Sequence, residues 1–362
     1  MKIVCVGGGP AGLYFATLVK LLNKNHEITI IERNPVGVTY GWGVVFDGRL
    51  LHNLYNNDFE TARRVRYSSA HRYRTEVYVK GKQAIWVGGY GLSIGRRLLL
   101  DILTKRAMDL GVDIQFEQEV KDLSRFADAD LIVACDGMNS RLRHLYTNHF
   151  QTNIDVRHNK YIWLGTTKVF DAFTFAFEET SAGWIWFHAY RFDNATSTFI
   201  VECLPQTWEG LGFGDRELDQ SIALLENIFE PYLDGHSLIH QMSLLGRAPW
   251  LNFRRISNEK WHHDNIVLMG DAAHTTHFTL GSGTTLAVED AISLARKLHE
   301  CEDLQAALKA YEEERRQALL IPQSAADNST QWFENIVNYT DQDARQFAFS
   351  MLNRYQAKRG AS

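Results

Sequence analysis

The feature that most constrains the fold is a glycine-rich turn at the amino end, in "MKIVCVGGGPAGLYFATLVK". The run from Ile3 to Val6 has the length and β-branching of a buried parallel strand, and an amphipathic helix follows it. Gly7, Gly9 and Gly12 have the spacing in which glycines allow a tight turn, backbone approach to a pyrophosphate, and close helix–strand packing. The pattern predicts a strand-turn-helix that holds a dinucleotide phosphate on the helix N-terminus.

A second strand, "EITIIER", supports this interpretation by placing Glu32 twenty residues after Gly12. An acidic side chain at this distance accepts hydrogen bonds from a ribose in dinucleotide-binding folds. The alternative is a glycine-rich turn with a solvated Glu32, but three agreeing features favour the dinucleotide site.

The same arrangement recurs in residues 264 to 291, "DNIVLMGDAAHTTHFTLGSGTTLAVEDA". An apolar strand ends near Asp271, and Gly281 and Gly283 precede what reads as a helix. Glycines reduce stability in regular structure, so this turn indicates a role in binding.

The order of elements predicts an α/β fold. "VDIQFEQEV" and "ADLIVACDG" read as further strands of the first sheet, and four strand-like runs between residues 160 and 203 suggest an antiparallel sheet. The tail from Leu304 reads as helical, with a break expected at Pro322. We expect a Rossmann-like dinucleotide-binding domain (residues 1–70, 92–150 and 259–303), a mainly antiparallel substrate domain (71–91 and 151–258) and a helical C-terminal segment (304–362).

Composition favours a cytoplasmic enzyme. The 362 residues are 45% hydrophobic and 22% charged, and the net charge of −5 argues against a nucleic-acid partner. The first strand begins at residue 2, which leaves no room for a signal peptide, and no uncharged apolar run reaches membrane-spanning length. Four separated cysteines without a CxxC pair are expected to be reduced core residues, so no metal site is predicted. They are Cys5, Cys135, Cys203 and Cys301.

Three separated motifs resemble those of the group A flavoprotein monooxygenases of the para-hydroxybenzoate hydroxylase type. They are the Gly7–Gly12 turn with Glu32, "DLIVACDGMNSRLR" with Asp136, Gly137, Ser140 and Arg143, and "GDAAH" with Gly281 and Gly283. The resemblance implies that Asp271 binds the ribityl or ribose chain of FAD. It also implies that backbone amides near the glycines approach the isoalloxazine edge, where a helix N-terminus favours negative charge.

The cofactor-binding residues implied by the resemblance are Gly7, Gly9, Pro10, Ala11, Gly12, Glu32, Arg33, Val44, Arg96, Val120, Asp136, Gly137, Asp271, Gly281, Gly283, Thr284 and Thr285. The chain departs from the family pattern at two positions expected to lie near the flavin. Phe278 stands where proline is usual, and Thr285 stands where asparagine is usual.

Finer resemblance concerns the substrate. "GWGVVFDG", "FDAFTFAFEET", "HAYRFDNATSTFIVE" and "APWLNFRR" resemble the subgroup of salicylyl-CoA 5-hydroxylase and of the monooxygenase part of 2-aminobenzoyl-CoA monooxygenase/reductase. "NKYIWLGT" also resembles a subgroup that hydroxylates tryptophan-derived intermediates in violacein synthesis. The aryl-CoA match is the longer one.

The implied chemistry uses NAD(P)H to reduce the flavin, O2 to form a C4a hydroperoxide, and transfer of OH to an electron-rich aromatic ring. Only one dinucleotide fingerprint is present, so we expect NAD(P)H to bind transiently. A base that withdraws a phenolic proton would activate the ring further, and His188, His274 and His277 are candidates by location. For each histidine, a role as a hydrogen-bonded core residue is an equal alternative.

An arginine-rich stretch, "ARRVRYSSAHRYR", is a candidate for binding the phosphates of CoA, because the guanidinium fork donates two hydrogen bonds and stays charged. Its arginines are Arg63, Arg64, Arg66, Arg72 and Arg74. The alternative is a solvated strand and turn whose arginines pair with carboxylates. "NFRR", at residues 252–255, is the next candidate for the phosphates.

Two other function classes stay open at this stage. A flavin-dependent halogenase would share the FAD motifs, and "WIWF" at residues 184–187 partly matches its tryptophan motif. A non-catalytic FAD-binding module is the second. The acyl group, the choice of NADH or NADPH, and the oligomeric state are not predicted.

Overall fold

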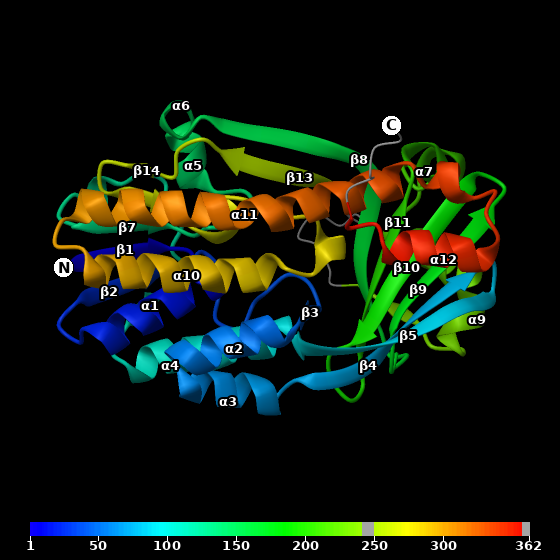
Figure 1. The fold of residues 1–362 in the computed structure, drawn as a ribbon, viewed down its shortest axis with the longest axis horizontal. Helices are drawn as coiled ribbons and strands as arrows, with labels where there is room; N and C mark the ends of the chain where they lie inside the picture. Colours follow the sequence, from blue (N-terminus) through cyan, green and yellow to red (C-terminus); the bar gives the residue numbers. More distant parts are fainter. Residues whose placement is uncertain (241–249, 357–362) are drawn as a thin grey trace.

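The protein is described by a computed structural model that covers residues 1–240 and 250–356. Two β-sheets lie side by side along the long axis, each with its own helices, and the long helix α11 runs beside both (Figure 1). The α/β class and the two-sheet organisation expected from the sequence are confirmed.

The first sheet has six strands in the order β14-β15-β7-β1-β2-β6. Every neighbouring pair is parallel except β14 with β15. The strands are β1 (Lys2–Val6), β2 (Glu27–Ile31), β6 (Asp113–Gln115), β7 (Leu131–Ala134), β14 (His262–His263) and β15 (Ile266–Leu268). Helices α1 (Pro10–Leu22), α4 (Arg96–Asp109) and α10 (Gly283–Glu300) pack together beside this sheet (Figure 1).

The second sheet has the order β12-β8-β11-β10-β9-β4-β5-β3, and β13 also pairs with β8. All pairs are antiparallel except β4 with β9. The strands are β3 (Gly43–Phe46), β4 (Ala70–Val79), β5 (Lys82–Gly95), β8 (Thr152–Thr166), β9 (Phe173–Thr180), β10 (Gly183–Arg191), β11 (Ser197–Cys203), β12 (Leu238–Ile239) and β13 (Leu251–Asn258). The four strands expected between residues 160 and 203 are therefore confirmed as β8 to β11.

The other α-helices are α2 (Gly48–Asn57), α3 (Phe59–Tyr67), α5 (Arg141–Leu145), α6 (Thr147–Phe150), α7 (Pro205–Gly210), α8 (Leu218–Ile228), α9 (Glu230–Leu233), α11 (Leu304–Glu334) and α12 (Ala344–Leu352). Short 3-10 helices are η1 (Ser124–Phe126), η2 (Gly270–Ala272), η3 (Phe278–Leu280) and η4 (Ile336–Tyr339). In residues 1–240 and 250–356, none of the helices has the length and apolar composition that crossing a bilayer requires.

The second sheet buries both faces, as strand β10 illustrates. Ile185 and Phe187 point to one face and pack with Phe229 near α8 and α9. Trp186 points to the opposite face and packs against Phe333 of α11. We call this second face, which also carries His188, the inner face. The inner face lies against η3, as shown by the stacking of His188 of β10 on Phe278 of η3.

Two expectations for local structure are wrong. The tail does not break at Pro322, which lies inside the continuous helix α11. Leu319 and Ala326 are buried on either side of the proline, so packing holds both halves of the helix in place despite the lost hydrogen bond. The arginine-rich stretch is not a strand and turn alone, since it begins in helix α3 and continues into strand β4.

The domain ranges expected from the sequence stay a prediction. One detail bears on them: β3 lies within residues 1–70, assigned to the FAD-binding domain, yet it pairs with β5 of the second sheet.

Candidate cofactor and substrate site

The first two motifs meet because β1 and β7 are neighbouring parallel strands. Gly7 has φ +117°, and a Cβ added there would lie 2.3 Å from the carbonyl oxygen of Cys135. A Cβ added to Gly12 would lie 2.4 Å from the carbonyl oxygen of Gly7. The turn therefore packs backbone against backbone at the end of β7, where the Asp136–Gly137 motif begins.

Arg143 of the second motif connects it to the third motif, the GDAAH turn. This buried side chain donates from Nη1 to the carbonyl oxygen of Ala272 at 3.0 Å and from Nη2 to that of Met138 at 2.7 Å. On the other side, a Cβ added to Gly270 would lie 3.1 Å from the Cβ of Ala11. Three segments far apart in sequence thus enclose one region at the carboxyl ends of the strands, which is where α/β sheets bind ligands.

Glu32 has a structural role that sequence reasoning missed. Its Oε2 accepts the Gly8 N–H at 2.7 Å, and its Oε1 accepts the Asn34 N–H at 2.8 Å. The carboxylate therefore ties the glycine turn to the end of β2. An ionised carboxylate has about four acceptor positions, so the ribose contact expected of Glu32 is compatible with these bonds and stays a prediction.

Asp271 faces Arg96, and both were expected to bind the cofactor. Asp271 is accessible to solvent, yet desolvation by the surrounding protein raises the pKa of its carboxyl group, while the charge of Arg96 acts to lower it. A side chain that solvent can reach, but that protein atoms surround, lies in a depression of the protein surface. Arg96, at the start of α4, donates from Nε to Thr39 Oγ1 at 3.0 Å, which fixes its position.

Asp136 supplies the clearest sign of a missing partner. Its Oδ2 accepts the Arg141 N–H at 2.7 Å, but its Oδ1 is buried and has no hydrogen-bond partner among the described residues. Burial raises the pKa of this carboxyl group. A buried acceptor without a donor costs about 1–3 kcal/mol, so the site favours a ligand that brings a hydroxyl group.

These residues fit an FAD molecule. Asp136 and Asp271 can accept hydrogen bonds from sugar hydroxyls, and a Cβ added to Gly9 or Gly283 would meet no atom within 4 Å, which leaves room for a phosphate and a ring edge. Gly281 has φ +67° and closely approaches Val45 of β3, just before the start of α10.

The other expected cofactor residues lie in varied surroundings, and their contacts with FAD stay predictions. Pro10 is the first residue of α1. Val44 and Thr284 are half-buried, Val120 and Thr285 are buried, and Arg33 is exposed.

His274 belongs to a buried network beneath the Asp271 turn. Its Nε2 lies 2.7 Å from Asp290 Oδ2, which also accepts the Gly270 N–H at 3.0 Å. Arg315 Nε donates to Asp290 Oδ1 at 2.7 Å. This arrangement favours a role for His274 as a hydrogen-bonded core residue, because the network holds the turn that presents Asp271.

His188 and His277 both contact Phe278, with ring centroids 5.7 Å and 4.1 Å away. His188 is stacked between Phe278 and Phe173, with ring centroids 5.7 Å and 5.9 Å away, and its Nδ1 has no partner among the described residues. Burial, together with the nearby charge of Arg354, lowers the pKa of His188 to about 3. His188 is therefore neutral at physiological pH and has one ring nitrogen free for a ligand.

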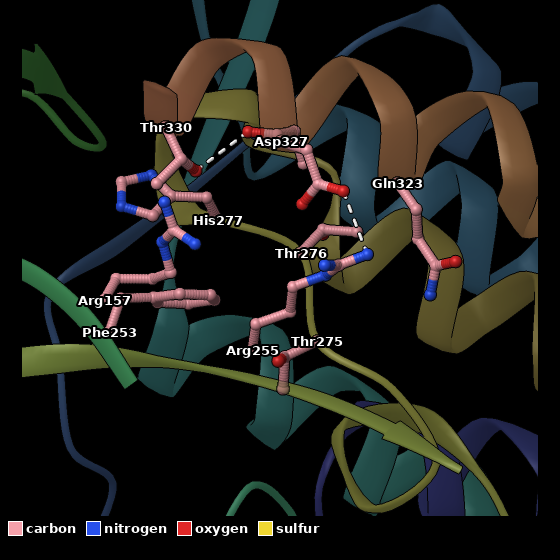
Figure 2. Close-up of a pocket in the computed structure, with 10 residues that line it drawn as sticks. Arg157, Phe253, Arg255, Thr275, Thr276, His277, Gln323, Asp327 and Thr330 are labelled. Carbon is pink, nitrogen blue, oxygen red and sulfur yellow. Dashed lines mark hydrogen bonds and ion pairs between the residues drawn. The ribbon is translucent and has the colours of Figure 1, made fainter. Parts of the chain in front are cut away.

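His277 faces a small pocket beside α11 (Figure 2). Burial lowers its pKa to about 3, and its Nδ1 lies 2.9 Å from Thr279 Oγ1. Phe253 packs against His277 at one end of the pocket, and Arg255 pairs with Asp327 at 2.9 Å at the other (Figure 2). The pocket is lined by Arg157, Phe253, Arg255, Thr275, Thr276, His277, Gln323, Ala326, Asp327 and Thr330.

The five arginines proposed for CoA differ in their partners and in their exposure. Arg63 and Arg64 pair with Glu60 on α3 at 3.1 Å and 2.7 Å. Arg74 pairs with Glu76 at 2.7 Å. Arg66 is exposed, whereas Arg72 is half-buried. The CoA role of these residues stays a prediction.

The fold and the site define a flavin-dependent enzyme, and comparison with known proteins agrees. Residues 1–327 match the family model described as "FAD binding domain". The chain is 38% identical to salicyloyl-CoA 5-hydroxylase of Streptomyces sp, over 98% of this chain and 70% of that protein. It is 32% identical to protodeoxyviolaceinate monooxygenase of Chromobacterium violaceum, over 93% of this chain and 90% of that protein.

The fold also resembles that of 2-methyl-3-hydroxypyridine-5-carboxylic acid oxygenase, solved in a tetrameric form. The TM-score is 0.76 at 19% identity, over 98% of this chain and 95% of that one. The protein belongs to the FAD-binding group A monooxygenases. It is a flavin-dependent aromatic monooxygenase with FAD as cofactor, in a family for which NAD(P)H, O2 and an aromatic substrate are typical.

Replacing Asp271 with alanine is expected to weaken FAD binding by about 1–3 kcal/mol, or roughly ten-fold to a hundred-fold in Kd, because the sugar hydroxyls of the cofactor lose a carboxylate acceptor. Fluorescence titration of the apoprotein with FAD measures this. Asp264→Ala, at an exposed aspartate at the start of the same segment, is the control and should bind FAD like the wild type. Wild-type affinity in Asp271→Ala would show that this carboxylate does not bind the cofactor.

Proposed function

We propose that this enzyme hydroxylates the aromatic ring of an aryl-CoA thioester, such as salicylyl-CoA at ring position 5, and that it works in the cytoplasm. The observation that carries the proposal is 38% identity to a salicyloyl-CoA 5-hydroxylase over 98% of the chain. In such a substrate, position 5 is para to the phenolic oxygen, which activates that carbon toward an electrophilic oxygen.

The protein's own contribution is binding and positioning. Asp136, Arg96 and Asp271 would hold the FAD sugar and ribityl chain. Bound FAD supplies the redox chemistry that uses NAD(P)H and O2 to oxygenate the ring. The packed rings around Phe278 would limit water at the reacting carbon.

His188 is our candidate for the group that accepts a hydrogen bond from the phenolic hydroxyl and orients it. Its burial disfavours the imidazolium, so the ring is neutral and its unpartnered Nδ1 can take a hydrogen bond from the substrate. His277 lies beside the same phenylalanine and is the second candidate. Flavin chemistry performs the oxidation, so the expected contribution of either histidine is activation of the ring.

A hydroxylase of a tryptophan-derived substrate is the second candidate function. It is supported by 32% identity to protodeoxyviolaceinate monooxygenase over 90% of that protein. The "WIWF" run gives no support to a halogenase, since Trp184 and Trp186 are buried in the core beside α11 and α12.

The test is NAD(P)H oxidation by the FAD-loaded protein with a panel of aryl-CoA thioesters, the matching free acids, and indoles, with products identified by mass spectrometry. We expect the fastest oxidation, and a hydroxylated product, with a hydroxyaryl thioester. Product from indoles alone would support the second candidate. Product from free acids alone would contradict the thioester proposal.

A further inference from the structure

Arg72 differs from the other arginines of its stretch in the direction of its side chain. It lies on β4 opposite Gly91 of β5, and a Cβ added to Gly91 would lie 2.4 Å from Arg72 Nη2. Its guanidinium lies over the ring of Phe173, 4.7 Å from the centroid. The β4–β5 register shifts between Arg72 and Arg74. Arg74 instead points to solvent and pairs with Glu76.

The charge of Arg72 has no anionic partner. No hydrogen bond or ion pair joins it to any residue within 1–240 and 250–356, and its Nε is fully buried. Burial lowers the pKa of its guanidinium group. A desolvated cation without hydrogen bonds is destabilising on its own, so an anion that binds beside it gains a strong, charge-assisted contact.

Arg354 provides a comparison within the same aromatic cluster. It is buried after α12 and lies over the ring of Phe175 at 5.4 Å. Its guanidinium is saturated, because it donates to Ser329 Oγ at 3.0 Å and to the carbonyl oxygens of Met351 at 2.7 Å and Thr279 at 3.3 Å. Arg354 thus joins the C-terminal segment to η3 and α11, whereas the guanidinium of Arg72 keeps its donors available.

A wall of aromatic rings connects Arg72 to the candidate catalytic region. Phe173 stacks on Tyr190 with centroids 5.3 Å apart and planes 7° apart, and on His188 at 5.9 Å. The Tyr190 hydroxyl donates to the Gly43 carbonyl oxygen at 2.9 Å, which fixes this wall against β3. His188 in turn stacks on Phe278 of η3, close to the expected flavin contacts. Flat rings of this kind suit a flat aromatic ligand.

We propose that Arg72 binds an anionic oxygen of the aromatic substrate, either a phenolate or a ring carboxylate, with Phe173 and Tyr190 beside the ring. The inference rests on the proposed function, because it assumes that an aromatic substrate binds at the inner face of the second sheet. A thioester such as salicylyl-CoA has no free carboxylate, so Arg72 would hold its phenolic oxygen. Arg72 would then favour the phenolate, the form of the ring that is most reactive toward an electrophilic oxygen.

The test measures ligand binding to the FAD-loaded protein, through the change in flavin absorbance, for salicylyl-CoA, benzoyl-CoA and free benzoate. We expect Arg72→Gln to raise the Kd of salicylyl-CoA roughly ten-fold or more, and to leave that of benzoyl-CoA little changed. A loss confined to benzoate would identify the carboxylate as the anion. Arg125→Gln, at an exposed arginine that also lies over a phenylalanine ring, 4.9 Å from the Phe126 centroid, is the matched control and should bind all three ligands like the wild type.

A second readout separates anion binding from a structural role. The phenolate absorbance band of bound salicylyl-CoA should form at a higher pH in Arg72→Gln than in the wild type. Arg72→Lys keeps the charge but loses the fork, so it should fold, retain FAD and bind salicylyl-CoA several-fold more weakly than the wild type. This variant keeps the test decisive if Arg72→Gln does not fold.

The inference is overturned if both Arg72 variants bind these ligands like the wild type, if Arg125→Gln weakens binding equally, or if the wild type binds none of the three. Failure of the proposed function has a different signature. In that case the wild type would bind benzoate through Arg72 but would not oxidise NAD(P)H with any aryl-CoA thioester.

Discussion

Replacing Asp290 with alanine lowers the free energy of unfolding by about 3–5 kcal/mol, the range for breaking a buried ion pair by removing one partner. Asp290 is fully buried and is bonded to His274, Arg315 and the Gly270 N–H. Its removal leaves the Arg315 charge in the core with only the half-buried Glu289 nearby. Chemical denaturation monitored by circular dichroism measures the loss.

The same residue predicts a pH dependence. Burial alone would raise the pKa of Asp290, but the charges and hydrogen bonds of His274 and Arg315 outweigh burial and lower it. A carboxyl group with a lowered pKa stabilises the fold above its unfolded pKa of about 3.9, and this contribution is lost as the pH falls through the folded value. The wild type should therefore lose more stability than Asp290→Asn on acidification below about pH 4.

Asp128→Ala is the control for the alanine variant, because Asp128 is an exposed aspartate that pairs with Lys2 on the surface. It should leave the melting temperature unchanged. If Asp290→Ala were as stable as Asp128→Ala, the buried network would not hold the turn that carries Asp271.

Replacing Gly7 with alanine should yield protein that purifies without flavin, with FAD affinity reduced by about a hundred-fold or more. The new Cβ would lie 2.3 Å from a backbone oxygen that cannot move away, at a φ of +117° that side chains rarely adopt. Strain and overpacking of this kind each cost about 1–3 kcal/mol. Flavin absorbance after purification and titration of the apoprotein with FAD measure the effect.

Two further glycines sharpen this experiment. A Cβ on Gly9 meets no protein atom within 4 Å, so Gly9→Ala should melt like the wild type but bind FAD more weakly if the pyrophosphate approaches this backbone. Gly88→Ala, also in open space but in strand β5 of the second sheet, should change neither property. Unchanged FAD binding in both Gly7→Ala and Gly9→Ala would contradict the proposed position of the cofactor.

The sequence predicted the elements that a short run of neighbouring residues determines. The Gly7–Gly12 turn and the Asp136 and Asp271 motifs combine short apolar strands with glycine spacing, and each observed strand lies where the pattern indicates. The antiparallel strands between residues 160 and 203 were equally clear, because turn residues separate them.

The features that were missed depend on contacts between distant residues. Pro322 favours a helix break locally, but burial on both sides keeps α11 continuous. Arg72 lies over Phe173 while Arg74 pairs with Glu76 near the surface, and no periodicity of β4 alone encodes this difference. The bond between Glu32 and the Gly8 N–H likewise forms only when β2 lies beside β1.

The most direct test of the account is turnover of salicylyl-CoA by the FAD-loaded enzyme with NAD(P)H under 18O2, followed by mass spectrometry of the thioester. A monooxygenase places one oxygen atom of O2 in the product, so we predict a ring-hydroxylated thioester that carries a single labelled oxygen, formed in step with NAD(P)H consumption. Consumption of NAD(P)H that yields only hydrogen peroxide and unaltered thioester, or a hydroxylated product without label, would contradict it.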